Sequence, residues 1–244
     1  MIPAATLIVL RPAAAGPPEI LVVERAAGMA FAGGATVFPG GRIDDADHAL
    51  AARLGHPDAA AKITALRETV EESAVAPGLV GALDPSLGPR LQTALLGGMP
   101  FADVLDAHCL TVDLAALTAF ARWSPAFNHA RRFDTLFYLV AAPAGDCAPV
   151  PQPGECAAAY WISAAALLAR IASGDAHAIF PTKRNLERLA RFDSLAAAIA
   201  DASAFPLDTI RPWIEQRADG PHVCIPADRG YPITSEPMTS AIRA

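Results

Sequence analysis

The sequence predicts an α/β sandwich built around a mixed sheet. Short runs rich in β-branched residues alternate with helical segments along most of the chain, and this alternation is typical of a sheet covered by helices. A cluster of short helical pieces in the middle indicates an inserted segment. Hydrophobic residues make up 53% of the 244 residues, enough for a full core. Much of that fraction is alanine, which buries little area per residue.

Four segments at the N-terminus are expected to be regular. Residues 4–10 and 19–24 are predicted strands, because each is a β-rich run and a loop rich in Pro and Gly separates them. The run ATVF, residues 35–38, predicts a short strand that leads into Pro39-Gly40-Gly41. A short helix is expected next, starting at Asp44-Asp45 and stopping at Gly55.

The second expected helix covers residues 59–75 and stops before Pro77-Gly78. We then expect a helical insertion at about 84–122 that shows no recognisable chemistry. Its pieces are predicted at Arg90–Leu96, Phe101–His108 and Leu114–Ala121. After it, strands are expected at 131–143 and 158–163, a helix at 164–174, and one long amphipathic helix or two joined ones at 181–202. The Pro-rich tail from Phe205 is expected to wrap the surface.

Charge and composition exclude some functions. The formal net charge of -6 argues against a general nucleic-acid binder, which needs clustered Lys and Arg, but a local basic patch could still hold one anionic small molecule. No apolar segment is long enough to predict a membrane span. The four cysteines are scattered without a Cys-x-x-Cys pair, which favours reduced thiols. We therefore expect a cytoplasmic protein without nucleic-acid or membrane partners.

The clearest chemical signal is the acidic end of the second helix. Glu68, Glu71 and Glu72 stand at positions i, i+3 and i+4 and so share one helical face, where their like charges repel. Arg67 offsets part of this repulsion through an i,i+4 pairing with Glu71. Hard cations such as Mg²⁺ take carboxylate oxygens together with substrate phosphates. A solvated acidic surface is the alternative, and the residues upstream decide between the two.

Those upstream residues complete a motif that resembles the Nudix box. The box consists of Gly, five residues, Glu, seven residues, and then Arg-Glu-hydrophobic-x-Glu-Glu-x-Gly-hydrophobic. Gly41 matches its glycine, and Asp47 falls at the first Glu. The second half is matched by Arg67, Glu68, Glu71, Glu72 and Val75. The sequence departs from the box in three ways: Asp47 replaces Glu, Ala74 replaces Gly, and residues 48–66 stand where the box has seven.

The enlarged box is similar to one branch of the family, that of peroxisomal coenzyme A diphosphatase and its bacterial relatives. Residues 21–47, 122–143, 154–163 and 180–192 also look similar to that branch. The resemblance implies one Nudix domain over 1–244, a Nudix-type α/β/α sandwich with a box insertion at about 48–60 and the helical insertion. Because a loop can grow at little entropic cost when its ends stay in place, the box insertion need not move the metal ligands.

The resemblance also implies roles for individual residues. Glu71 and Glu72 are implied to ligate Mg²⁺ or Mn²⁺, and Glu68 to serve either the metal or as the base. Arg67 is implied to orient a glutamate, and the carbonyl of Gly41 to be a further ligand.

Two further carboxylates are less certain. A later loop often supplies one more carboxylate in this family, and Glu155 is our candidate; a surface glutamate is the alternative. We expect Asp47 to be structural, pairing with Arg67 or capping the inserted helix.

The expected substrate is an anionic small molecule. Its phosphates are expected to meet Arg25, Arg131 and Arg132, although a solubilising surface role is the alternative for each arginine, and to meet the close-approaching backbone at Gly40. The leading hypothesis is hydrolysis of the pyrophosphate bond in a nucleoside diphosphate linked to another moiety, with coenzyme A or acyl-CoA favoured by the branch.

Three alternatives stay open at this point. Asp47 and Ala74 allow a ligand-binding or regulatory protein that keeps the Nudix fold without turnover. A third reading is an acidic structural helix in an unrelated α/β protein. A homodimer is a candidate assembly by analogy.

Overall fold

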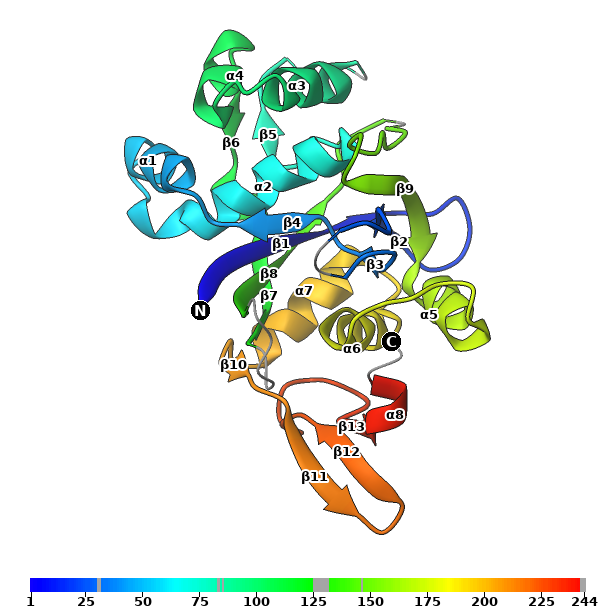
Figure 1. Ribbon diagram of the computed structural model, residues 1–244. Coiled ribbons are helices and arrows are strands. Elements are labelled where there is room, and N and C mark those ends of the chain that lie inside the picture. The colour runs from blue at the N-terminus through cyan, green and yellow to red at the C-terminus, as the bar shows by residue number, and fades with distance from the viewer. Residues whose placement is uncertain (30–31, 83, 85, 125–131, 146, 242–244) are drawn as a thin grey trace.

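The computed structural model describes residues 1–29, 32–82, 84, 86–124, 132–145 and 147–241 (Figure 1). Its centre is a mixed eight-stranded sheet in the order β10-β7-β8-β1-β2-β3, with β4 also paired to β1 and β9 to β2. The strands are β1 (Ile2–Arg11), β2 (Glu19–Arg25), β3 (Thr36–Val37), β4 (Gly40–Arg42), β7 (Thr118–Trp123), β8 (Phe133–Ala141), β9 (Cys156–Ser163) and β10 (Thr209–Ile210). The predicted mixed sheet is confirmed.

Strand β1 has two different partners along one edge. On that edge, the beginning of β1 pairs with β4, where Ala5 faces Gly41 and Thr6 faces Gly40, and the end of β1 pairs with β2. On its opposite edge, β1 pairs in parallel with β8 from Ile2 to Leu10. The sheet therefore splits beside Gly40 and Gly41, and the split leaves room for side chains from a helix above it.

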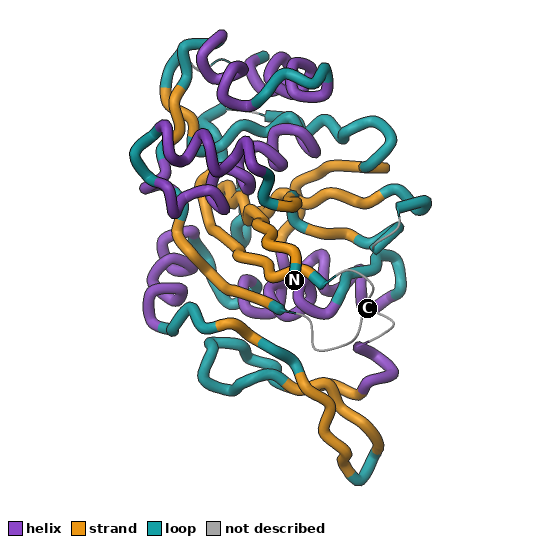
Figure 2. Tube along the Cα trace, turned by 60° about the vertical axis from the view of Figure 1, so that its left-hand side comes forward, coloured by secondary structure: helices purple, strands orange, loops and turns teal. Residues whose placement is uncertain are grey.

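Helices cover both faces of the sheet (Figures 1 and 2). One face carries α2 (Ala60–Ser73), with α1 (Asp45–Arg53), α3 (Leu87–Leu96) and α4 (Phe101–Ala107) around it. The other carries α5 (Ala164–Ser173), α6 (Phe180–Leu189) and α7 (Leu195–Ala204). Alternate residues of β1 serve the two layers: Leu7 packs in the core with α2, and Ile8 in the core with α6.

Several predicted boundaries are confirmed. The helix expected at 59–75 is α2, whose final residue precedes Ala74, held in the left-handed conformation at φ 56°. The helix expected after Asp44 is α1, with Asp44 as its N-cap and Gly55 just beyond its end at φ 77°. The segment 181–202 contains two helices, α6 and α7, which was one of the two alternatives.

The prediction of a third helix in the insertion, at Leu114–Ala121, is wrong. Residues Leu114–Ala116 form one 3-10 turn, and Thr118–Trp123 are strand β7 of the central sheet. Antiparallel pairing with β8 supplies backbone hydrogen bonds that override the helix preference of the alanines. The helices of the insertion are thus α3 and α4, and a short ladder of β5 (Leu79–Val80) with β6 (Thr111–Val112) closes the segment.

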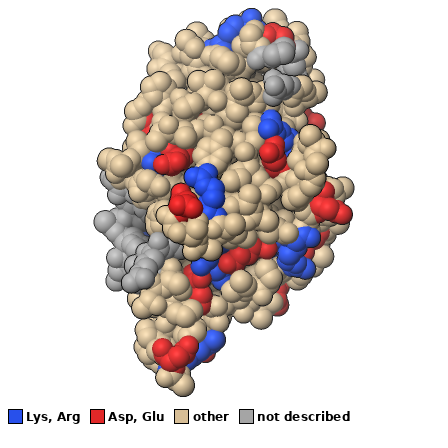
Figure 3. Space-filling model, turned by 90° about the vertical axis from the view of Figure 1, so that its right-hand side faces the viewer, with Lys and Arg blue, Asp and Glu red and all other residues tan. Residues whose placement is uncertain are grey.

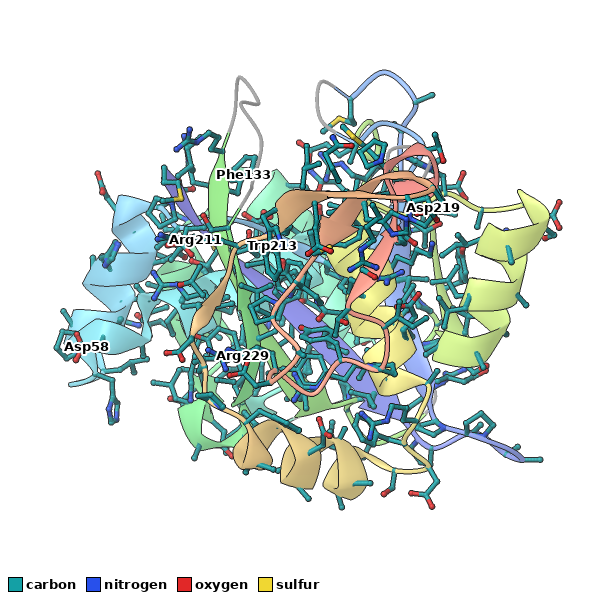
Figure 4. The ribbon with its side chains drawn as sticks, turned by 90° about the horizontal axis from the view of Figure 1, so that it is seen from below. Asp58, Phe133, Arg211, Trp213, Asp219 and Arg229 are labelled. Carbon is teal, nitrogen blue, oxygen red and sulfur yellow. The ribbon has the colours of Figure 1, made fainter. Side chains whose placement is uncertain are left out.

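The C-terminal tail is also more ordered than expected. It forms a three-stranded sheet of β11 (Trp213–Arg217), β12 (Gly220–Cys224) and β13 (Ser235–Pro237), followed by α8 (Met238–Ala241). The loop at Arg229 lies beside the layer of α6 and α7 (Figure 4), whereas the hairpin of β11 and β12 projects away from that layer (Figure 1). Polar contacts anchor β13 to the layer: Arg184 of α6, 1% exposed, donates to Glu236 at 3.0 Å. The expectation of a surface wrap missed this sheet, because its strand pairing is not visible as a local pattern.

Two surface properties bear on partners. In the described ranges, no helix has both the length and the apolar character needed to cross a membrane. On the face shown in Figure 3, basic and acidic side chains lie next to one another rather than forming a basic field.

Candidate active site

The turn at Gly40 and Gly41 approaches two other elements closely. A side chain at Gly40 would collide with the carbonyl of Ala5 and with Thr6, and one at Gly41 would collide with the carboxylate of Glu68. Space therefore requires glycine at Gly40, where the obstacle is backbone, whereas a side chain at Gly41 would displace the Glu68 carboxylate. This close approach brings the backbone of β4 against the second half of α2.

Glu72 lies at the centre of this contact. Its side chain is buried, with the residue 2% exposed. One carboxylate oxygen accepts a hydrogen bond from the Gly40 amide at 3.0 Å, and the other lies 3.7 Å from the guanidinium of Arg25. Burial, and then the nearby charge of Glu68, raise the pKa of Glu72 to about 8. The site thus holds a carboxylate whose charge is poorly compensated.

Arg67 holds the other two carboxylates of the helix. It donates to Glu68 at 2.9 Å and to Glu71 at 3.3 Å, so the predicted i,i+4 pairing is confirmed. The contact with the adjacent Glu68 was not predicted. Burial raises the pKa of Glu68 to about 7 although Arg67 opposes it, and burial also raises the pKa of Glu71. The three glutamates therefore form one crowded acidic group.

Asp47 fixes Arg67 from the opposite side. Its two oxygens accept from the guanidinium at 2.9 Å each, and the residue is 1% exposed. It also accepts from the Thr64 hydroxyl at 2.8 Å and from the Asp44 amide at 3.1 Å, which completes the capping box of α1. The structural role predicted for Asp47 is confirmed in both of its forms. The aspartate is long enough because α1 begins directly beside Arg67.

Glu155 lies near the acidic group on a loop that covers the end of α2. Val150 and Gln152 of this loop donate backbone hydrogen bonds to Ser73 and Glu72, at 2.8 and 3.2 Å. The Glu155 carbonyl accepts from Ala26, directly after Arg25, at 2.8 Å. Its exposed side chain is close enough for its charge to raise the pKa values of Glu71 and Glu72.

The three arginines predicted to contact phosphate, Arg25, Arg131 and Arg132, differ in how close they lie to the acidic group. Arg25 is part of the site through its contact with Glu72. Arg132 is exposed and immediately precedes β8, and its carbonyl accepts from Ile2 at 2.7 Å. Ile2 stands three positions before Ala5, the residue of β1 that faces Gly41. The backbone of Arg132 is therefore about 10 Å along the strand from that turn, at the edge of the site. Arg131 lies outside the described residues.

The carboxylates do not form a ready-made cage for a metal. Among the described residues, no group of three or more His, Cys, Asp or Glu side chains has the arrangement to hold an ion, because Arg67 and the Gly40 amide engage the three glutamates. The donor set nevertheless fits a hard divalent cation. It offers carboxylate oxygens of one buried and two half-buried glutamates within one helical turn, and such oxygens are what Mg²⁺ takes.

The large hollow beside the box insertion is separate from this acidic group. It measures about 770 Å³ and is lined by residues 54–59, Lys62 and 111–115. Lys62 is six residues before Glu68 on α2, about 120° away around the helix. Because none of the three glutamates lines this open groove, the candidate active site is the acidic group and not the groove.

Part of the site has no signal in the sequence. The loop that caps α2 does so through backbone amides, and backbone hydrogen bonds between distant segments leave no residue pattern. The bond from Thr64 to Asp47 belongs to no motif either. By contrast, the contact of Glu68 with Gly41 could be expected, since the box pairs these two halves.

The comparisons with known proteins agree with this geometry. No protein-family model matches the sequence. The crystal structure of a NUDIX hydrolase from Alicyclobacillus acidocaldarius matches with a TM-score of 0.69 and 31% sequence identity, covering 82% of this chain and 96% of that one.

Two other solved structures match more weakly. The NUDIX domain of Shewanella oneidensis NrtR, solved with ADP ribose, is 15% identical with a TM-score of 0.42, over 69% of this chain and 77% of that one. A C. elegans Ap4A hydrolase is 13% identical with a TM-score of 0.41, over 84% and 96%. Neither is close enough to support an argument. The first match covers almost the whole of its relative at 31% identity and shares the predicted sandwich, so this chain belongs to the Nudix hydrolases, a family of pyrophosphohydrolases.

Proposed function

We propose that this protein hydrolyses the pyrophosphate bond of a nucleoside diphosphate linked to another moiety, with Mg²⁺ or Mn²⁺, and that coenzyme A or an acyl-CoA is its substrate. The observation that carries the proposal is the acidic group of buried Glu72 and half-buried Glu68 and Glu71 against the Gly40-Gly41 turn. Such a concentration of charge costs stability in an empty protein. A divalent cation and a phosphate together would compensate it.

The metal would be held by groups on three segments. Glu71 and Glu72 are the proposed principal ligands, together with Glu68 and the carbonyl of Gly41, and Glu155 would add an oxygen from the loop. When bound, a divalent cation neutralises charge on the phosphate oxygens and lowers the pKa of a coordinated water.

The remaining roles follow from charge. Glu68 would either ligate the metal beside Glu71 and Glu72 or take a proton from the attacking water. Arg25 now faces Glu72 and would turn its guanidinium towards a substrate phosphate. Arg131, Arg132 and the Gly40 backbone are the other proposed phosphate contacts. Arg67, fixed by Asp47, would keep Glu68 and Glu71 in register.

The choice of coenzyme A rests on the enlarged box and on the stretches similar to the coenzyme A diphosphatase branch. Two of the three departures from the box, Asp47 and Ala74, are compatible with the proposed turnover. Asp47 reaches Arg67 directly, and Ala74 adopts the left-handed conformation that the box glycine would take.

A substrate panel tests the proposal. Purified protein is incubated with coenzyme A, acyl-CoA, ADP-ribose, NADH and nucleoside triphosphates, each with Mg²⁺ or Mn²⁺, and products are identified by mass spectrometry. We expect the CoA compounds to yield adenosine 3′,5′-bisphosphate and 4′-phosphopantetheine or its acyl derivative. Faster cleavage of another substrate would overturn the CoA assignment. The absence of turnover for the whole panel, with ligand-induced stabilisation retained, would favour a binding protein.

The Glu72→Gln variant tests the site itself. The amide can still accept from Gly40, but it lacks the charge. We expect kcat to fall by at least about 100-fold, the scale of losing one positioned carboxylate. The melting temperature should not fall, because the charged form of Glu72 is destabilised by burial. Glu215→Gln, on exposed β11, is the matched control and should keep full activity.

A further inference from the structure

The last turn of α2, which carries Glu71 and Glu72, is capped by distant segments. A helix ordinarily leaves its last four carbonyls without partners inside the helix. Here the Val70 carbonyl accepts from Ala74 at 2.9 Å, while the carbonyls of Glu72 and Ser73 accept from the loop amides of Gln152 and Val150. The remaining carbonyl, that of Glu71, needs a partner from elsewhere.

Gln92 of α3 supplies that partner. Its amide nitrogen donates to the Glu71 carbonyl at 2.9 Å and to the Val150 carbonyl at 2.8 Å. A primary amide has two hydrogens on this nitrogen, so both bonds can form at once, and two carbonyl partners fix the orientation of the amide. The residue is 5% exposed. Gln92 therefore joins the metal-binding helix to the loop at a point sheltered from water.

The same loop determines where Glu155 lies. Beyond Val150, the Cys156 amide donates to the Gln152 carbonyl at 3.0 Å and closes a turn around Glu155. Because the Glu155 side chain is exposed, its position depends on the loop backbone rather than on packing. On the sheet side, the Glu155 carbonyl is bonded to the Ala26 amide, so the attachment of the loop to α2 is what fixes Glu71 and Glu72 relative to Glu155.

We propose that Gln92 is a positioning residue, which clamps the Val150–Glu155 loop to the last turn of α2 and thereby holds Glu155 in place as a metal ligand. The inference rests on the proposed function in taking Glu155 as a ligand. It gives the inserted helix α3 a role at the site that its sequence did not reveal.

The clamp can be removed without undocking α3. This helix also packs on α2 through Leu91 and Leu95 of the main core, and Gly88 lies so close to the Ala74 carbonyl that a side chain there would collide with it. The loss of two hydrogen bonds should therefore loosen the loop and leave the helix attached.

The experiment compares Gln92→Met with Leu95→Ala. Methionine has a similar length but no donor, whereas Leu95→Ala weakens the packing of the same helix and leaves the amide of Gln92 untouched. Hydrogen exchange of the Val150 and Gln152 amides is measured first, without metal. Mn²⁺ binding is then measured by calorimetry, and kcat and KM on the best substrate of the panel.

For Gln92→Met we expect both loop amides to exchange faster and the Kd for Mn²⁺ to rise about 10-fold, as is usual when a group that orients a ligand is lost. We also expect kcat to fall more than KM changes. Leu95→Ala should lower the melting temperature and leave the exchange of the two amides and the Kd for Mn²⁺ near wild type. Wild-type values for Gln92→Met, or equal loosening by Leu95→Ala, would overturn the proposal.

A double-mutant cycle with Glu155→Gln identifies the route of the effect. If Gln92 acts through Glu155, Gln92→Met should weaken Mn²⁺ binding little further in the Glu155→Gln background. An undiminished effect in that background would refute the positioning role. If wild type neither binds Mn²⁺ nor turns over any substrate, the proposed function fails, and with it the ligand role of Glu155; amide exchange still decides whether Gln92 clamps the loop.

Discussion

Replacing Asp47 by alanine is expected to destabilise the protein more than any change at an exposed residue of α1. Asp47 is 1% exposed and meets three partners: the guanidinium of Arg67, the Thr64 hydroxyl and the Asp44 amide. The alanine variant would leave all three without the acceptor they now have.

The size of the effect follows from those partners. Loss of the capping-box bond costs about 1 kcal/mol, and loss of the bond from the Thr64 hydroxyl, which can still donate to the Ala60 carbonyl, costs about 1 kcal/mol. Breaking a fully buried ion pair costs about 3–5 kcal/mol, but Arg67 keeps Glu68 and Glu71 and retains some access to water, so we take about 2 kcal/mol. We therefore expect a loss of about 4 kcal/mol, or about 8–16 °C in melting temperature for a chain of this size.

Urea unfolding of Asp47→Ala beside Asp45→Ala measures this. Asp45 is exposed in the same first turn of α1, where it contributes only a favourable interaction with the helix dipole of about 0.3–1 kcal/mol. Equal losses for the two variants, or a loss below about 1.5 kcal/mol for Asp47→Ala, would show that Asp47 is not the buried acceptor described above.

Three further predictions concern other parts of the molecule. Glu236→Ala should cost about 3 kcal/mol, because Arg184 would stay buried with less compensation, and limited proteolysis should then cut the C-terminal sheet faster; wild-type resistance would contradict this. Burial raises the pKa of Glu187 to about 7 from 4.5, so its contribution is most favourable below pH 4.5 and is lost as pH rises through 7. Between pH 4.5 and 8, the unfolding free energy of Glu187→Gln should rise by up to about 3 kcal/mol relative to that of the wild type. Parallel curves of unfolding free energy against pH for the two proteins would refute the pKa shift. Ala74→Gly should raise the unfolding free energy by about 0.5 kcal/mol, since relief of the left-handed strain exceeds the loss of a buried methyl group; a lower melting temperature would show the reverse.

Local periodicity was sufficient to predict the elements that bury one face. Strand β1 alternates between two cores, and α2 places Leu66 and Val70 inside while its glutamates face the turn. Strand β7 was mistaken for a helix because its alanines favour helix. Its actual conformation depends on β8, with Thr118 paired to Leu139, and such non-local pairing leaves no short-range pattern.

The candidate site also has a part that local sequence patterns predict and a part that they do not. Spacing placed Arg67 and the three glutamates together on one helix, and the resemblance to the Nudix box gave them their predicted role. The loop that brings Glu155 to them is held by backbone amides and by Gln92, and a glutamine among leucines gives no indication of its partner. Sequence reasoning could therefore name Glu155 as a candidate but could not say what holds it.

The enlarged box raises the question of why extra chain does not displace the ligands. Helix α1 is fixed at its start by Asp47 on Arg67 and near its end by Arg53 on Asp106, at 2.7 and 3.1 Å. The second pair is exposed on both sides, so it contributes at most about 1 kcal/mol. The first is buried and shares its arginine with Glu68. The inserted helix is thus attached to the site at one essential point, and additional residues beyond Arg53 would add only the slowly growing entropy of a longer loop, about 0.6 kcal/mol for each doubling of its length.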